Sequence, residues 1–179
     1  MIILIGASAS GKTEVAKILR TKYNLQKVIT HTTRPMRVNE VNGIDYFFVD
    51  EKEFRQLAFE GKFIETTKYN GNYYGTSRAQ VKDDKVLIID PNGLKAFRDI
   101  GDSHIVSFLF QVDQITRYNR MIERGDDANA AHKRIINDQS KFTLSNVGRT
   151  DYIIDSENFN LDEVCEKVYS LYIHTLNSK

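Results

Sequence analysis

A short stretch near the start of the chain, LIGASASGKTEV (residues 4–15), contains residue types that can hold phosphate. The pattern G-x-x-x-x-G-K-[ST] is matched by Gly6, Gly11, Lys12 and Thr13. Glycines let the backbone wrap around a phosphate, a helix N-terminus attracts negative charge, Lys12 adds a cation, and the Thr13 hydroxyl suits Mg²⁺. We therefore expect a nucleoside triphosphate with Mg²⁺ on the loop Gly6, Ala7, Ser8, Ala9, Ser10, Gly11, Lys12 and Thr13.

The hydropathy pattern predicts the elements that position this loop. Continuous apolar runs, typical of strands buried on both faces of a parallel sheet, occur at Ile2–Ile5, Val86–Ile89, Ile105–Phe110 and Tyr152–Ile154. Helical patterns lie between these runs at Glu14–Tyr23, Pro91–Ile100 and Gln114–Arg124. The alternation predicts an α/β fold in three layers. It also places the loop between a strand and a helix, which disfavours the alternative of a glycine-rich turn without a ligand.

The middle third of the chain has a different pattern. Ile44–Val49 predicts a strand, and Asp50 followed by Glu53 predicts the capped start of a helix. Asn70-Gly71 between strand-like flanks predicts a hairpin. We expect this part of the chain to form a small, largely antiparallel lobe inserted into the parallel core. The expected boundaries are residues 34–81 for the lobe, and 1–33 with 82–179 for the core, in one compact unit.

Composition narrows the class of protein. Among 179 residues, 25 Lys and Arg nearly balance 24 Asp and Glu, which argues against a nucleic-acid-coating or membrane-surface role. The single cysteine, Cys165, excludes an intramolecular disulfide, and its helical apolar spacing predicts a buried thiol. The apolar run Met1–Ile5 is too short for a signal peptide, so we expect a cytoplasmic protein. The four histidines have no metal-ligand spacing, and both monomer and homodimer remain open.

A second set of cations follows the loop. Arg34 and Arg37 lie three residues apart around Pro35, with Tyr46 shortly after them. Two guanidinium groups on an extended segment can clamp a second phosphate through forked hydrogen bonds. Taken alone, these residues fit a solvated arginine pair better than a phosphate clamp.

The segment from Thr30 to Thr76 contains the successive motifs TTRPMR (32–37), EVNGIDYFFV (40–49), FIE (63–65) and GNYYGT (71–76). In order and spacing these motifs resemble the guanylate kinase family. With the phosphate loop, IIDPNG (88–93) and the arginine-bearing segment 117–134, the similarity covers most of the chain. The resemblance implies a P-loop kinase core with a five-stranded parallel sheet, an inserted mixed GMP-binding lobe and a helical lid at about residues 113–140.

The same resemblance implies transfer of the γ-phosphoryl group of ATP to GMP, and also to dGMP, with ATP and GMP as the small-molecule partners. It assigns the GMP phosphate to Arg34, Arg37, Tyr46 and Tyr74. It assigns the base to Thr30, Glu65, Thr76 and Asp90. The assignment is chemically sound because guanine presents N1–H and N2–H₂ donors, which an ionised carboxylate can accept. A site built on such hydrogen bonds rejects adenine, whose N1 is an acceptor.

A basic segment resembles the family's lid. The family pattern R-x-x-x-R-G followed by K-R-[LI] is matched by Arg120, Arg124-Gly125 and Lys133-Arg134-Ile135. The resemblance implies that Lys12, Arg120, Arg124 and Arg134 are the catalytic cations. Such a role is reasonable because phosphoryl transfer is catalysed mainly by positioning and positive charge. For Arg117, on the same helix, we prefer a salt-bridged helix surface.

Three positions depart from the family pattern. Ala9 stands where the family favours glycine, and we expect it to be tolerated only with a negative φ. Ile88 replaces a common acidic residue two places before Asp90. Ser156 stands where an asparagine is usual, which leaves the contact with the ATP base open.

Two other functions fit parts of the pattern. A non-catalytic guanylate-kinase-like binding module would share the acceptor lobe, but such modules usually have a degraded phosphate loop. A kinase for a phosphorylated sugar would share the phosphate loop, but it has no need of Glu65, Thr76 and Asp90. The intact loop and the base-reading residues together favour the nucleotide kinase.

Overall fold

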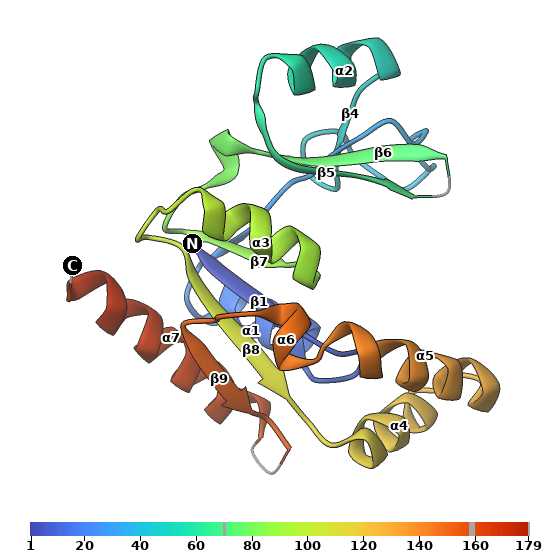
Figure 1. The fold of residues 1–179 in the computed structure, drawn as a ribbon, viewed down its shortest axis with the longest axis vertical. Helices are drawn as coiled ribbons and strands as arrows, with labels where there is room; N and C mark the ends of the chain where they lie inside the picture. The colour runs from blue at the N-terminus through green and yellow to red at the C-terminus, as the bar shows by residue number, and fades with distance from the viewer. Residues whose placement is uncertain (70, 158–159, 179) are drawn as a thin grey trace.

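The computed structural model describes residues 1–69, 71–157 and 160–178. Within these residues the strands form two sheets, a five-stranded and a four-stranded one, which Figure 1 shows in two separate parts of the molecule. The larger sheet has the order β2-β7-β1-β8-β9 and all its pairings are parallel. Its strands are β2 (Gln26–Lys27), β7 (Lys85–Ile88), β1 (Ile2–Gly6), β8 (Val106–Gln111) and β9 (Tyr152–Asp155).

Helices cover both faces of this sheet. One face carries α1 (Lys12–Lys22) and α7 (Leu161–Asn177), whose apolar residues pack with Ile2 and Leu4 of β1. The other face carries α3 (Pro91–Asp99) and α6 (Leu144–Val147), which pack with Ile3 and Ile5. Alternate β1 residues therefore supply two separate apolar cores, and the predicted three-layer α/β fold is confirmed. Cys165 is buried in the first core, as predicted.

The smaller sheet belongs to a part of the molecule that we call the small lobe (residues 31–80). It has the order β4-β3-β6-β5, with β3 (His31–Thr32), β4 (Phe47–Phe48), β5 (Phe63–Tyr69) and β6 (Asn72–Ser77). The sheet is mixed, because β3 and β4 are parallel whereas the other pairs are antiparallel. Helix α2 (Glu51–Phe59) covers it, and a short 3₁₀ helix (Arg78–Gln80) leads back to the core.

Two of the three secondary-structure elements that the sequence predicted in the small lobe are confirmed. The Asp50 carboxylate caps α2 by accepting the Glu53 N–H at 2.7 Å, as predicted. The predicted hairpin is confirmed by the antiparallel pairing of β5 with β6 up to Tyr69 and Asn72, although residue 70 of its turn lies outside the described residues. The strand predicted at Ile44–Val49 is wrong over its first half, where the chain forms a turn.

The reason for that turn is a local hydrogen-bond network. Gly43 has φ of 79°, and the Val41 N–H donates to the Asp45 carboxylate at 2.8 Å. These polar contacts close the backbone on itself, so only Phe47 and Phe48 reach the sheet.

Two further helices form a hairpin that we call the lid (residues 114–141). It consists of α4 (Gln114–Glu123) and α5 (Ala128–Lys141), which Figure 1 shows side by side beyond the carboxyl end of β8. Met121, Ala131 and Ile135 form a small apolar cluster between them, against which Ala9 and Tyr118 pack. No helix in the described ranges is long and apolar enough to cross a bilayer.

Candidate active site

The loop of residues 6–13, here called the phosphate loop, lies between the central strand β1 and helix α1. β1 is completely buried, so the start of the loop is fixed by the core. A side chain at Gly6 would bring its Cβ within 2.6 Å of the Phe110 carbonyl oxygen, which explains the glycine. Gly11, with φ of 91°, precedes the first turn of α1 and leaves its N–H groups uncapped by any side chain. The free amides at a helix N-terminus make an anion-binding site.

Position 9 corrects an expectation. Ala9 has φ of 60°, in the left-handed region, rather than the negative φ expected from its side chain. A non-glycine residue in that region costs about 1–2 kcal/mol. Its methyl group packs against the lid cluster of Met121, Ala131 and Ile135, a contact that glycine would lose. The loop therefore keeps the glycine-like backbone while the side chain joins it to the lid.

Lys12 is folded over the loop. Its Nζ donates to the Ala7 carbonyl oxygen at 2.6 Å and to Ser10 Oγ at 2.9 Å. Burial lowers the pKa of Lys12 to about 8, the Asp138 carboxylate raises it, and the Arg117 guanidinium lowers it. A bound phosphate would stabilise the charged form of Lys12, which burial disfavours, so the site favours an anionic ligand.

A cavity of about 470 Å³ opens beside the loop. Seven of the predicted site residues line it together: Ala9, Ser10, Gly11, Lys12, Thr13, Arg120 and Arg124. Arg120 Nη2 donates to the Ser156 carbonyl oxygen at 2.9 Å and its Nη1 lies 3.4 Å from the Ala9 carbonyl oxygen. The Ser156 hydroxyl in turn donates to the Ser10 carbonyl oxygen at 3.0 Å. Ser156 is thus a buried brace of the phosphate loop.

The outer lid arginines are paired with one acid that the sequence did not single out. Asp126 accepts from Arg124 at 2.6 Å and from Arg134 at 2.9 Å. Arg134 is exposed and, in the described part of the chain, does not line the cavity beside Lys12. The structure therefore brings Arg120 and Arg124 to the loop and leaves Arg134 outside.

Arg117 forms a salt bridge, as expected, but with Asp138 inside the molecule and not at the helix surface. It is 4 % exposed rather than a surface residue, and its guanidinium lies against the phosphate loop. Its Nη1 is 3.5 Å from the Ser8 carbonyl oxygen and 3.5 Å from Asp138 Oδ2. Sequence reasoning missed Asp138 because a single acid in a polar helix carries no pattern.

A second cavity, of about 410 Å³, lies between the small lobe and the end of β7. Its lining includes five predicted residues: Thr30, Glu65, Tyr74, Thr76 and Asp90. A register shift in β5 between Phe63 and Glu65 brings Glu65 opposite Thr76, whose hydroxyl donates to the carboxylate at 2.7 Å. Burial raises the pKa of Glu65 above its usual value, and the nearby Asp90 charge adds to the rise.

Asp90 enters this cavity from the core. It caps α3 by accepting the Gly93 N–H at 3.0 Å, and its other oxygen lies 3.0 Å from Lys141 Nζ. Burial raises the pKa of Asp90, but the Gly93 hydrogen bond and the Lys141 charge outweigh it and hold that pKa below its usual value. Asp90 therefore remains an ionised hydrogen-bond acceptor beside the more protonatable Glu65.

The arginine pair of the small lobe has two different environments. Arg34 is half-buried, pairs with Glu40 at 2.6 Å and lies 5.5 Å from the centre of the Tyr46 ring. Glu40 also accepts the backbone N–H of Arg37 at 2.8 Å, whereas the Arg37 side chain is exposed. Tyr46 and Tyr74 lie near each other, with ring centres 6.2 Å apart. Three of the four predicted phosphate-holding side chains are therefore clustered.

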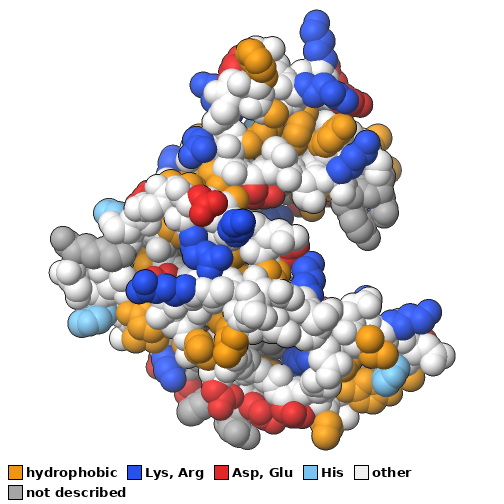
Figure 2. Space-filling view, viewed as in Figure 1, with side chains coloured by type: hydrophobic (Ala, Val, Ile, Leu, Met, Phe, Trp, Pro, Cys, Tyr) orange, Lys and Arg blue, Asp and Glu red, His pale blue; other side chains and the backbone are white. Residues whose placement is uncertain are grey.

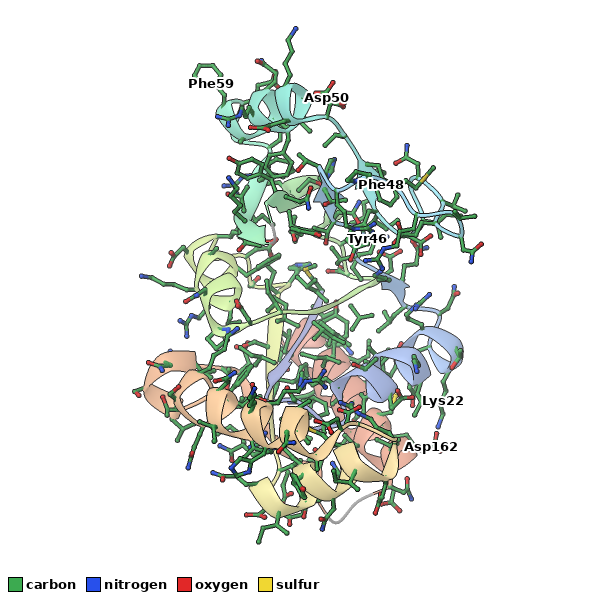
Figure 3. The ribbon with its side chains drawn as sticks, turned by 90° about the vertical axis from the view of Figure 1, so that its right-hand side faces the viewer. Lys22, Tyr46, Phe48, Asp50, Phe59 and Asp162 are labelled. Carbon is green, nitrogen blue, oxygen red and sulfur yellow. The ribbon has the colours of Figure 1, made fainter. Side chains whose placement is uncertain are left out.

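A third cavity connects the two sides. It has a volume of about 410 Å³, and its lining includes Thr13 of the phosphate loop together with Thr30 and Tyr46. Figure 3 shows Tyr46 on the side of the small lobe that faces the core. Figure 2 shows the surface hollowed between the small lobe and the lid. The donor-side and acceptor-side residues therefore share one cleft.

The parallel sheet, with a phosphate loop after its central strand and a second anion-binding region across a cleft, defines a P-loop phosphotransferase. The family model described as guanylate kinase matches residues 1–174. A curated guanylate kinase from Nitrosomonas europaea is 32% identical over 178 residues, which cover 96% of this chain and 87% of that protein.

Solved structures agree. The guanylate kinase of Anaplasma phagocytophilum superposes with a TM-score of 0.63 and 26% identity over 97% of this chain and 85% of that one. A gluconokinase from Sinorhizobium meliloti 1021 has a TM-score of 0.54 and 11% identity over 97% and 91% of the two chains, a likeness of fold alone. The chain belongs to the guanylate kinase family, the ATP:GMP phosphotransferases.

Proposed function

We propose that this chain transfers the γ-phosphoryl group of ATP to GMP or dGMP across the cleft between the phosphate loop and the small lobe. In this proposal residues 1–33 and 82–179 are the ATP-binding core, and residues 34–81 form the GMP-binding lobe. The observation that carries it is the shared cavity lined by Thr13 on the donor side and Tyr46 on the acceptor side. The reacting groups of two bound nucleotides can meet there.

On the donor side, the amides of the phosphate loop and Lys12 would hold the ATP phosphates. Arg120 and Arg124 line the same cavity and would neutralise charge as it spreads over the transferred phosphoryl group. Arg134 would join them only after the lid closes, and both outer arginines would have to exchange Asp126 for phosphate. Closure of this kind also excludes water from the site.

On the acceptor side, Arg34, Arg37, Tyr46 and Tyr74 would hold the GMP phosphate. Thr30, Glu65, Thr76 and Asp90 would surround the base. Glu65 and Asp90 present carboxylate oxygens to one cavity, and those oxygens match the N1–H and N2–H₂ donors of guanine. Adenine would leave these carboxylate acceptors unpaired, so the site would discriminate between the two purines.

The residues present fit a magnesium ion that arrives with ATP. The described residues contain no group of three His, Cys, Asp or Glu side chains that could hold a metal by itself. Mg²⁺ needs few protein ligands when phosphate and water complete its octahedron. The exposed Thr13 hydroxyl at the start of α1 would be its protein ligand, and the ion would offset phosphate charge.

The buried, unpaired Cys165 fits a reducing compartment, and we place the protein in the cytoplasm as a monomer or homodimer.

The test is an ADP-release assay with ATP and each of GMP, dGMP, AMP, CMP and UMP. We expect turnover with GMP and dGMP and little with the others. Equal turnover of AMP and GMP would refute the base-reading site, and no turnover with any acceptor would favour a non-catalytic binding module.

A further inference from the structure

The base of the lid is attached to the phosphate loop by a buried ion pair. Asp138 of α5 accepts the backbone N–H of Ser8 through Oδ2 at 2.6 Å. Arg117 of α4 lies 3.5 Å from that same Oδ2 and 3.5 Å from the Ser8 carbonyl oxygen. One residue of the loop is therefore held on both sides of its backbone, by one side chain from each lid helix.

Burying this ion pair requires removing two charged groups from water, which opposes folding. Arg117 is 4 % exposed and Asp138 is 9 % exposed. Among the described residues the buried Nε of Arg117 has no hydrogen-bond partner, and both contacts of its Nη1 are long. A buried ion pair with incomplete hydrogen bonding contributes little to stability compared with apolar residues of similar size. Its presence calls for a role other than stability.

The positions of the pair within the lid suggest that role. Arg117 lies about one turn before Arg120 in α4, and Arg124 is the residue that directly follows this helix. Asp138 lies four residues, or one turn, after Arg134 on α5. The pair thus lies where both helices join the core, and the lid arginines lie farther out along the same helices. Ala9 adds a contact by packing against the lid cluster.

We propose that Arg117 and Asp138 are positioning residues that couple the lid to the phosphate loop through Ser8. When the triphosphate orders the loop, Ser8 carries the bases of α4 and α5 with it, and the lid arginines move toward the phosphates. Movement of the lid in turn acts on the loop. Both charges also act on Lys12, because the Asp138 carboxylate raises its pKa and the Arg117 guanidinium lowers it.

The inference rests on the proposed kinase activity, and the test uses four variants: Asp138→Asn, Asp138→Ala, Arg117→Leu and the double variant Arg117→Leu/Asp138→Ala. We expect Asp138→Ala and Arg117→Leu each to lower kcat with GMP by about 10- to 100-fold, because small displacements of catalytic groups have effects of that size. The Kd of GMP, measured by calorimetry without ATP, should change less than twofold. Glu123→Gln, an exposed acid on α4, is the matched control and should behave as wild type.

The double variant separates coupling from stability. Removing one partner leaves an unpaired buried charge, whereas two apolar residues can replace a buried pair without loss of stability. The Tm of the double variant should therefore be close to the wild-type value. Its kcat should stay about tenfold low, because the Ser8 N–H has lost its acceptor. Amide exchange of residues 6–13 should be faster than in wild type and should slow less on addition of ATP. A double variant with wild-type kcat, or with a GMP Kd that rises as much as kcat falls, would overturn the proposal.

If Asp138→Ala and the double variant do not fold, Asp138→Asn provides the test. It keeps an oxygen acceptor for Ser8 but has no charge for Arg117, so kcat should fall severalfold and loop exchange should rise. Wild-type values for both would overturn the coupling. Absence of GMP turnover in the wild-type protein would instead refute the proposed function, and the ATP-dependent exchange of the loop would still test the coupling.

Discussion

The two sides of the cleft bind their anions by opposite means. The donor side is a contiguous loop of eight residues between a fully buried strand and a helix, and much of its binding surface is backbone. The acceptor side uses side chains drawn from residues 30–90, across short strands, a turn and the start of α3. Backbone amides on a rigid core suit phosphate, which every nucleotide carries. Separate side chains suit the choice of a particular base.

The two sides also differ in how firmly they are held. Every residue of β1 is buried, whereas the small lobe buries few apolar side chains, among them Phe54 and Phe63. A region with few buried apolar contacts opens at lower free energy than the core. The small lobe is therefore the part of the cleft that we expect to move when substrates enter.

The largest effect should come from the donor side. Lys12→Ala removes the cation buried over the loop, and we expect kcat to fall by about 10³-fold, a loss typical of a cation that stabilises phosphoryl transfer. The Kd of GMP should not change, because the acceptor cavity does not include Lys12. Steady-state kinetics and calorimetry measure the two quantities. Unchanged turnover would contradict the role of the loop.

On the acceptor side, Glu65→Gln should chiefly change the choice of base. The glutamine amide offers a donor where guanine also presents donors, so we expect kcat/KM for GMP to fall by about 10²-fold. The kcat/KM for AMP should not fall, so the ratio of kcat/KM for GMP to kcat/KM for AMP should decrease. Glu60→Gln, at an exposed carboxylate of the same lobe, is the control. An equal loss for both acceptors would point to a structural role for Glu65.

The arginine pair offers a sharper comparison within the acceptor side. Arg34 is half-buried and clustered with Tyr46, whereas the Arg37 side chain is exposed. We expect Arg34→Ala to raise the KM for GMP by about 10- to 100-fold, since a hydrogen bond to a charged group is worth about 1.5–3 kcal/mol. Arg37→Ala should have a smaller effect unless closure buries it. Equal effects would show that the lobe reorganises around GMP.

The two sides should also titrate at opposite ends of the pH range. Lys12 has a pKa of about 8 and is charged below it, so kcat/KM for ATP should fall about tenfold per pH unit above that value. Glu65 must be ionised to accept from guanine, so kcat/KM for GMP should fall as the pH drops. Because the pKa of Glu65 is raised, this fall should begin at a higher pH than an ordinary carboxyl group would give. Glu65→Gln should remove this acid limb and keep the basic one. An acid limb that persists in the variant would belong to another group.

The strands that the sequence did not predict are short and polar. The four apolar runs were found as strands because they are continuous, and two of them, β1 and β8, are buried on both faces as that pattern predicts. β2, Gln26–Lys27, completes the sheet as a fifth strand but is exposed and has no apolar pattern. β3, His31–Thr32, is equally short and joins the second sheet rather than the first. Two residues carry too little pattern to be recognised, and only their neighbours in space assign them to a sheet.

The sequence alone identified the phosphate loop, because its chemistry lies in eight consecutive residues of a recognisable pattern. It also provided the acceptor residues through the order of their motifs. Only the tertiary structure brought Glu65 and Asp90 to one cavity, paired the outer lid arginines with Asp126 and buried Arg117 against Asp138 and Ser8. Those contacts join residues far apart in the chain or oriented by packing. Whether such residues are buried or paired depends on how the chain packs in three dimensions, which a pattern of neighbouring residues does not specify.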